Sequence, residues 1–145
     1  MVRLFGGGMM RTIKFRGKSL ESGLWYYGYY ICHDFMNSHF IIEDDINIRV
    51  QVDPDTVGQF AGLLDKNGVE IYENDVVAIT FWDGTGMGDT GVGVVEWDEE
   101  SSMFRWLSGD PDDEDKYWLN ESQSRYISIK GNITDNPELM RASDD

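Results

Sequence analysis

The sequence predicts a mainly β protein with short helical turns only, and three observations support this fold class. Apolar and polar residues alternate with a period of two, as in Thr12–Arg16, and no long stretch shows the period of a helix. Sequences that cap a helix are soon followed by glycine, as where Gly58 and Gly62 follow Asp53-Pro54. Compact corners rich in Asn, Asp and Gly separate the apolar segments, as in small all-β domains.

Residues 11–55 are expected to form an N-terminal antiparallel β-sheet lobe. After Thr12–Arg16, the segment Leu24–Ile31 is aromatic and rich in strand-forming residues. Gly28 stands near its centre, and a glycine inside a strand is typical of a bulge or a close backbone approach. Two further short strands are predicted, at Phe40–Ile42 and Ile46–Val52.

Residues 56–135 are expected to form a second lobe, in which short strands build a small closed or half-closed barrel. Asn67-Gly68 predicts a tight hairpin turn, because both residues tolerate a positive φ. The nearly unbroken apolar run Val76–Trp82 is typical of a strand covered on both faces. More strands are predicted at Val92–Trp97, Met103–Leu107 and Arg125–Ile133. The cap Asn136-Pro137 then predicts a short C-terminal helix over residues 136–142.

The two lobes are expected to pack together in a single domain over residues 11–143. No linker rich in proline, serine or charge marks the boundary near residue 55. Residues 1–10 contain three consecutive glycines and lack the features of a signal peptide, so we interpret them as a flexible extension. The continuous apolar runs are too short for a transmembrane helix, and no membrane partner is expected.

The charge of the chain is strongly negative and unevenly distributed. Twelve Lys and Arg oppose 27 Asp and Glu, a net charge of -15. Residues 1–68 carry 7 basic and 8 acidic side chains, whereas residues 69–145 carry 5 basic and 19 acidic ones. Such a field repels phosphates and anionic lipids, which disfavours nucleic acid as a partner and favours a solvated surface. An acidic protein that imitates DNA and inhibits a host nucleic-acid enzyme is the alternative that this charge leaves open.

Three patterns in the sequence contain groups found in chemical sites, but none of them predicts such a site. Cys32, His33 and His39 offer a thiolate and imidazoles, but nothing in the sequence supplies a fourth ligand for zinc. The Gly-rich run 83–91 lacks the lysine of a phosphate-binding loop, and a strand follows it. The acidic run 110–115 ends on Asp where a calcium loop requires Gly. We therefore expect no catalytic, cofactor-binding or metal-binding residues, no cofactor and no enzymatic activity.

The second predicted strand carries the candidate partner surface. Trp25, Tyr27 and Tyr29 alternate along it, so they share one face. One face of such a strand fills the core, and the other requires a cover from another lobe, a second subunit or a partner protein. The basic strand beside it, with Lys14 and Arg16, leaves open the stacking of single-stranded nucleic acid on these rings.

Several longer motifs are specific enough to indicate a family. They are Ile13-Lys14-Phe15-Arg16-Gly17-Lys18, Val52-Asp53-Pro54 with Thr56-Val57-Gly58-Gln59-Phe60, Asp65-Lys66-Asn67-Gly68, Glu70-Ile71-Tyr72-Glu73, and Gly131-Asn132-Ile133 with Asp135-Asn136-Pro137-Glu138-Leu139. In these residues the chain resembles the YopX family of bacteriophage and prophage proteins, over residues 11–139. It departs at Asn74, where the family usually has Gly. Asn also accepts the left-handed conformation, so this corner is expected to survive.

The resemblance implies a mostly β protein whose C-terminal part is similar to a Src-homology-3-like barrel. It also implies a phage or prophage origin and a setting in the bacterial cytoplasm. It brings no activity and no catalytic residue. Taken with the aromatic strand, it leads us to expect an accessory, non-catalytic β module that binds a partner protein or a second copy of itself.

Overall fold

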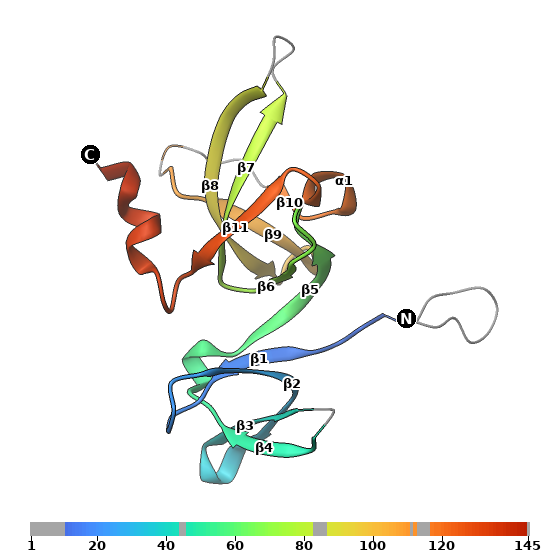
Figure 1. Ribbon diagram of the computed structural model, residues 1–145, viewed down its shortest axis with the longest axis vertical. Coiled ribbons are helices and arrows are strands. Elements are labelled where there is room, and N and C mark those ends of the chain that lie inside the picture. The colour runs from blue at the N-terminus through green and yellow to red at the C-terminus, as the bar shows by residue number, and fades with distance from the viewer. Residues whose placement is uncertain (1–10, 44–45, 83–86, 111, 113–116, 145) are drawn as a thin grey trace, which may run out of the picture. The chain divides into compact units, whose positions relative to one another are not determined.

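The computed structural model describes residues 11–43, 46–82, 87–110, 112 and 117–144. The extension predicted at residues 1–10 lies outside this range, as do most of the acidic run and the centre of the Gly-rich run. The chain divides into two compact units, Met1–Gly62 and Leu63–Asp145, which are described one at a time (Figure 1). Within the described ranges, no helix is long and apolar enough to cross a membrane.

The first unit contains five neighbouring antiparallel strands of a six-stranded sheet, in the order β4-β3-β2-β1-β5. Its strands are β1 (Phe15–Lys18), β2 (Trp25–His33), β3 (Ser38–Glu43), β4 (Ile48–Gln51) and β5 (Gly58–Leu64). Short 3-10 turns follow β2 and β4, at η1 (Asp34–Met36) and η2 (Pro54–Thr56). The strands predicted between residues 12 and 52 are therefore confirmed, and so is the short helical turn at Asp53-Pro54, where the Asp53 carboxylate accepts the Asp55 N–H.

The sheet of the first unit curls so that the ends of β1 and β4 meet. Ser19 and Val52 form a bridge, and the Asp53 N–H donates to the Lys18 carbonyl at 2.9 Å. The inner face holds the buried side chains of Ile41 and Val52. The close approach predicted at Gly28 is confirmed, because a Cβ atom there would lie 2.0 Å from the carbonyl oxygen of Ile42.

The second unit contains a five-stranded antiparallel sheet with the order β10-β9-β8-β7-β11. Its elements are β6 (Glu70–Tyr72), β7 (Asp75–Trp82), β8 (Met87–Asp98), β9 (Met103–Ser108), β10 (Tyr117–Trp118), α1 (Glu121–Ser124), β11 (Ile127–Asn132) and η3 (Pro137–Asp144). Val76–Ile79 are all buried, as expected for a strand covered on both faces. Neither sheet closes into a barrel in the part of the chain that the structure describes, so the Src-homology-3-like barrel is not confirmed.

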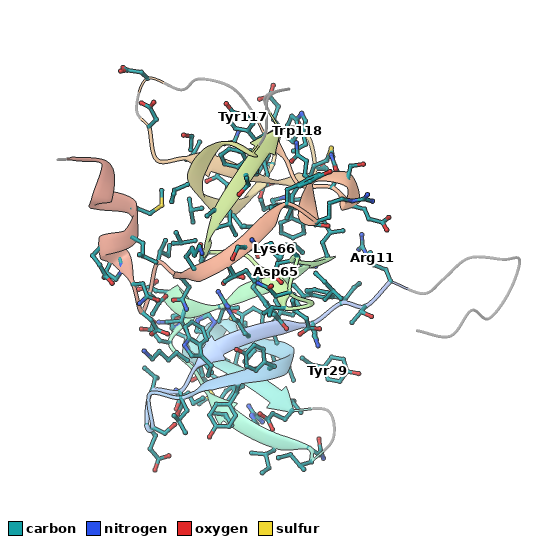
Figure 2. The ribbon with its side chains drawn as sticks, turned by 45° about the horizontal axis from the view of Figure 1, so that its top comes forward. Arg11, Tyr29, Asp65, Lys66, Tyr117 and Trp118 are labelled. Carbon is teal, nitrogen blue, oxygen red and sulfur yellow. The ribbon has the colours of Figure 1, made fainter. Side chains whose placement is uncertain are left out.

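The turn after β5 is held by a buried carboxylate. Gly68 has a φ of 81°, which confirms the positive φ predicted for this glycine, whereas Asn67 does not have a positive φ. The Asp65 carboxylate accepts the N–H groups of Asn67 at 2.8 Å and Val69 at 2.9 Å, and its other oxygen accepts the N–H of Ile129 at 3.1 Å. Figure 2 labels Asp65 beside Lys66. One side chain thus fixes the turn and joins it to β11.

Asparagine side chains hold the corners of the second unit. Asn74 has a φ of 74°, so the corner survives without the glycine that is usual in the family. Asn132 accepts the N–H groups of Thr134 and Asp135 through its side-chain oxygen, at 3.0 and 2.8 Å. A Cβ atom at Gly131 would lie 2.3 Å from the side-chain oxygen of Asn136. The family motif around Gly131 and Asn132 therefore fixes the backbone at the corner after β11 through hydrogen bonds and close packing.

Candidate partner surface on the N-terminal sheet

The three aromatic residues singled out in the sequence lie on one side of β2. Trp25, Tyr27 and Tyr29 alternate along the strand, and the register places Lys18 opposite Trp25 and Arg16 opposite Tyr27. We call this side of β1–β4 the outer face. The opposite, inner face carries the buried Ile41.

The outer face continues from β2 across β3 and β4. Ile42 lies opposite Tyr29, and Arg49 lies opposite Ile42 in turn. The basic residues at outer-face positions are Lys14, Arg16, Lys18 and Arg49. Arg49 is exposed and Lys14 and Lys18 are half-buried, whereas Arg16 is buried. These residues flank the aromatic strand β2 on both sides: Arg16 and Lys18 lie on β1, which is next to β2, and Arg49 lies on β4, which is separated from β2 by β3.

Apolar side chains on the outer face are exposed to solvent. Tyr27 is 45% exposed, Tyr29 is 53% exposed and Ile31 is 36% exposed, whereas Trp25 is half-buried. The Tyr29 ring stands clear of the ribbon in Figure 2. Contiguous apolar surface of this kind, bordered by charge, is typical of a site that another molecule covers.

Several basic groups of the outer face lie over aromatic rings. The guanidinium carbon of Arg16 lies 4.9 Å from the centroid of the Trp25 ring, and that of Arg49 lies 3.9 Å from the Phe40 centroid. Arg49 also donates to the His33 ring at 2.7 Å. Attraction between a cation and the ring quadrupole holds these heads in place. Arg49 is exposed and therefore presents its positive charge from a fixed position, whereas the guanidinium of Arg16 is buried.

Charge is segregated between the two faces of this sheet. In the described strands β1–β4, the outer face carries no carboxylate. Glu43 lies on the other side, at a register position opposite Ile48. The outer face is thus a basic and aromatic surface on a chain whose net charge is -15.

The two histidines and the cysteine of this sheet do not converge on one point. Cys32 and His39 are register partners, with 4.0 Å between the sulfur and Nε2, and His39 also contacts the Tyr30 hydroxyl at 2.6 Å. His33 points to the outer face, where it meets Arg49. Within the described ranges, no group of three or more His, Cys, Asp or Glu side chains is placed to hold a metal ion.

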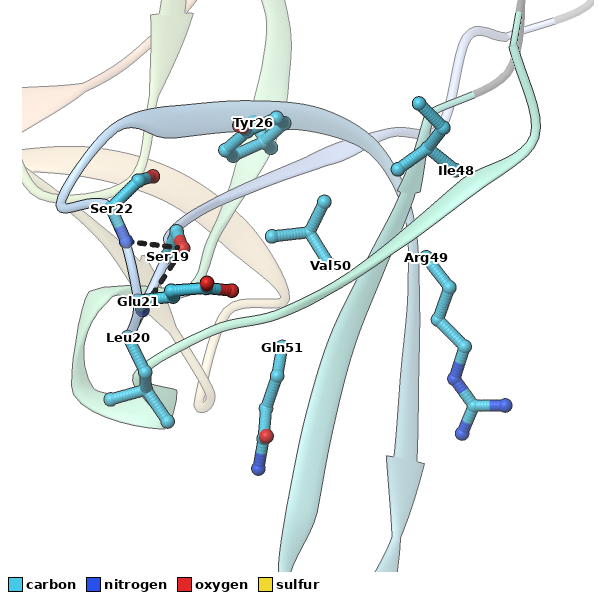
Figure 3. A pocket seen from close by; sticks show the side chains of 9 residues that line it. All are labelled: Ser19, Leu20, Glu21, Ser22, Tyr26, Ile48, Arg49, Val50 and Gln51. Carbon is cyan, nitrogen blue, oxygen red and sulfur yellow. Dashed lines mark hydrogen bonds between the residues drawn. The ribbon is translucent and has the colours of Figure 1, made fainter.

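A groove of about 320 Å³ opens beside β4. It lies between the β1–β2 turn and β4, with Tyr26 and Val50 in its wall (Figure 3). Ser19 shapes the turn by accepting the N–H groups of Glu21 at 3.1 Å and Ser22 at 3.0 Å. The lining is mixed polar and apolar, and its carboxylate comes from Glu21. We see no reacting set of groups in this groove.

Comparison with known protein families gives a match to the YopX protein family over residues 14–141. The chain belongs to the YopX family. The crystal structure of protein EF1440 from Enterococcus faecalis has a similar fold, with a TM-score of 0.53 and 21% sequence identity, over 90% of this chain and 99% of that one. The comparison with curated proteins gave no match.

In this YopX chain, the outer face contains more residues than the sequence indicated. Trp25, Tyr27 and Tyr29 do share one exposed face, but the contributions of Phe40 and Arg49 from β3 and β4 were missed. The signal was present in Ile46–Val52, where Ile48, Val50 and Val52 alternate with Asn47, Arg49 and Gln51. That alternation places Arg49 on the face away from Val52, although it does not reveal which strand lies alongside.

Proposed function

We propose that this protein is a non-catalytic binding module that takes a partner protein on the outer face of its N-terminal sheet. The observation that carries the proposal is the exposed row of Tyr27, Tyr29 and Ile31 on a strand inside a sheet. Strand residues are fixed in position, so they lose little conformational freedom on binding. Exposed tyrosines with a basic border are typical of the energetic centre of a protein interface.

The turn that ends β2 supports the same proposal. Phe35 is 94% exposed and Met36 is 62% exposed, and both lie in η1 between β2 and β3. Burying a side chain of this size stabilises a complex by roughly 1.5–3 kcal/mol. The β2–β3 hairpin therefore offers apolar contacts along one strand and at its tip.

We extend this proposed function to the biological setting that the family resemblance implies. The protein would be of phage or prophage origin and would act in the cytoplasm of a bacterial host. Its second unit would be related to Src-homology-3-like barrels. The partner would be a protein of the host or the phage, with a homo-oligomer as the other form of the same binding activity.

The test removes the rings and keeps the strand. The double variant Tyr27→Thr/Tyr29→Thr retains strand-forming residues, and Tyr126→Thr is a matched control because Tyr126 is 52% exposed in the second unit. Proteins retained from host lysate are identified by mass spectrometry, and light scattering reports self-association. We expect the double variant to lose its partner and the control to keep it. Retention of the same partner by the double variant, with an unchanged circular dichroism spectrum, would contradict the proposal.

A further inference from the structure

We infer that β4 binds an extended segment of a partner protein by strand addition, with a Lys or Arg side chain of that segment in the groove beside β4. This edge of the N-terminal sheet is separate from the outer face on which the proposed function rests. Two features support strand addition here: the direction of the backbone groups of β4, and the lining of the groove.

The backbone of β4 directs hydrogen-bonding groups away from its neighbour β3. In the described part of the chain, β4 is the outermost strand of its sheet and pairs with β3. Val52, which follows β4, donates its N–H to the His39 carbonyl on β3 at 2.9 Å. Backbone groups alternate in direction along a strand, so those of Arg49 and Gln51 point away from β3. The Gln51 carbonyl accepts the Leu20 N–H at 3.2 Å, which confirms this direction.

These outward groups match the backbone of another extended chain. Leu20 occupies the carbonyl of Gln51, so the open edge presents the N–H and C=O of Arg49 and the N–H of Gln51. Donors and acceptors at alternate residues are the pattern that an added strand satisfies. In strand addition, main-chain hydrogen bonds provide affinity, and pockets beside the edge select the side chains.

The groove provides such a pocket along this edge. The β1–β2 turn and β4 meet at the bridge between Ser19 and Val52, and the groove opens where they part. Tyr26 and Val50 add apolar surface to its wall (Figure 3). Its volume of about 320 Å³ is near the lower end of the range for ligand-binding clefts, so it suits one long side chain of the added strand.

The charge in the groove favours a basic side chain. Glu21 and Arg49 are the charged residues of its lining. The Arg49 guanidinium lies on the outer face, where it donates to the His33 ring at 2.7 Å and lies over Phe40. Glu21 is exposed, and its side chain extends from the turn toward β4 in Figure 3. A Lys or Arg side chain can therefore pack its aliphatic stem against Tyr26 and place its cation near Glu21. The net charge of -15 adds attraction for a basic segment.

The experiment follows the backbone amide signals of the full, isotope-labelled chain by NMR during titration with three peptides. The first is acetyl-Thr-Val-Thr-Lys-Thr-Val-Thr-amide, and the second has Glu in place of Lys. The third has Pro in place of both Val, which keeps the charge but removes two donors and disfavours a strand. Glu21→Gln is the test variant, and Glu99→Gln is the matched control, because Glu99 is exposed in the second unit.

We expect the Lys peptide to shift the amide signals of Arg49 and Gln51 and to bind about tenfold more tightly than the Pro peptide. It should bind about threefold more tightly than the Glu peptide, and Glu21→Gln should lose about threefold in affinity while Glu99→Gln changes little. Equal binding of the three peptides, an equal effect of both variants, or unchanged Arg49 and Gln51 signals at millimolar peptide would overturn the inference.

Two other results would assign this edge to a different occupant, and either one contradicts the inference. Dimers that dissociate in the variant Gln51→Pro, which removes one outward N–H, would show that a second copy pairs with β4. Tighter binding of the Lys peptide by a chain that begins at Arg11 would show that the N-terminal segment of the chain itself competes for the groove.

The outer face is tested separately from this edge. Tyr27→Thr/Tyr29→Thr should bind the Lys peptide as the wild type does, because neither residue lines the groove. If that double variant loses its lysate partner and keeps the peptide, both proposals hold. If it keeps the partner while the Lys peptide still binds at Arg49 and Gln51, the proposed function is wrong and strand addition stands. Loss of peptide binding in the double variant would place the peptide on the outer face and contradict strand addition.

Discussion

Replacing Asp65 with Ala tests how far one buried carboxylate stabilises the second unit. Asp65 is 6% exposed and its two oxygens accept three backbone N–H groups, from Asn67, Val69 and Ile129. A buried donor left without a partner costs about 1–3 kcal/mol. Asn67 and Val69 are exposed, so water can replace part of what they lose, whereas Ile129 is half-buried. We expect Asp65→Ala to lower the free energy of unfolding by about 3 kcal/mol.

A second substitution separates the two functions of this carboxylate. Asp65→Asn retains an oxygen for the turn N–H groups but can place its amide NH2 against the Ile129 N–H, so we expect a smaller loss of about 1–2 kcal/mol. Asp110→Ala is the control, because the Asp110 carboxylate accepts the Asp112 N–H at 2.9 Å in an exposed turn. That change should cost at most about 0.5 kcal/mol.

The assay is equilibrium denaturation by urea, followed by tryptophan fluorescence and circular dichroism. Hydrogen exchange of the Ile129 amide gives the local measurement, and it should speed up in both Asp65 variants. The reasoning would be refuted if Asp65→Ala unfolded at the same urea concentration as the control. It would also be refuted if Ile129 remained protected, since the carboxylate would then not hold β11 to the turn.

Two further predictions concern backbone geometry. Gly28→Ala should lower the free energy of unfolding by at least about 3 kcal/mol, because the new Cβ would lie 2.0 Å from the Ile42 carbonyl oxygen. Gly68→Ala should lower it by only about 1–2 kcal/mol, because a Cβ there meets open space and the cost is that of the φ of 81° alone. Equal melting temperatures for the two alanine variants would contradict this order. Asn74→Gly should leave stability within about 1 kcal/mol, because glycine readily adopts the φ of 74°. A large drop in its melting temperature would show that the Asn74 side chain itself holds the corner.

Local features of the fold could be predicted because short-range chemistry determines them. The aromatic, strand-forming residues of Leu24–Ile31 indicated β2, and Asn67-Gly68 indicated a turn in which the structure confirms the positive φ of Gly68. The short strand Tyr117–Trp118 and the helix Glu121–Ser124 were missed. The helix did have a signal, since Asn120 caps it by accepting the Gln123 N–H at 3.0 Å.

The arrangement of the strands could not be predicted in the same way. β1 lies between β2 and β5, so its two neighbours come from different distances along the chain. Alternation identifies the faces of a strand but does not identify the strand beside it. The outer face was therefore predicted only in part: Tyr27 and Tyr29 were assigned to it, while Arg49 and Phe40 join it through the pairings of β2 with β3 and of β3 with β4.

The position of β11 has a consequence for synthesis on the ribosome. β11 pairs with β7 at the edge of the five-stranded sheet, and the Asp65–Ile129 hydrogen bond spans 64 residues of sequence. Until Asn132 has been translated, β7 has β8 beside it but no neighbour on its other edge, although Val76–Ile79 are destined for burial. An apolar strand with an open edge recruits other nascent chains. The acidic side chains within residues 96–100 and 110–115 precede β11 in the sequence, and like charge of this kind opposes the association of chains.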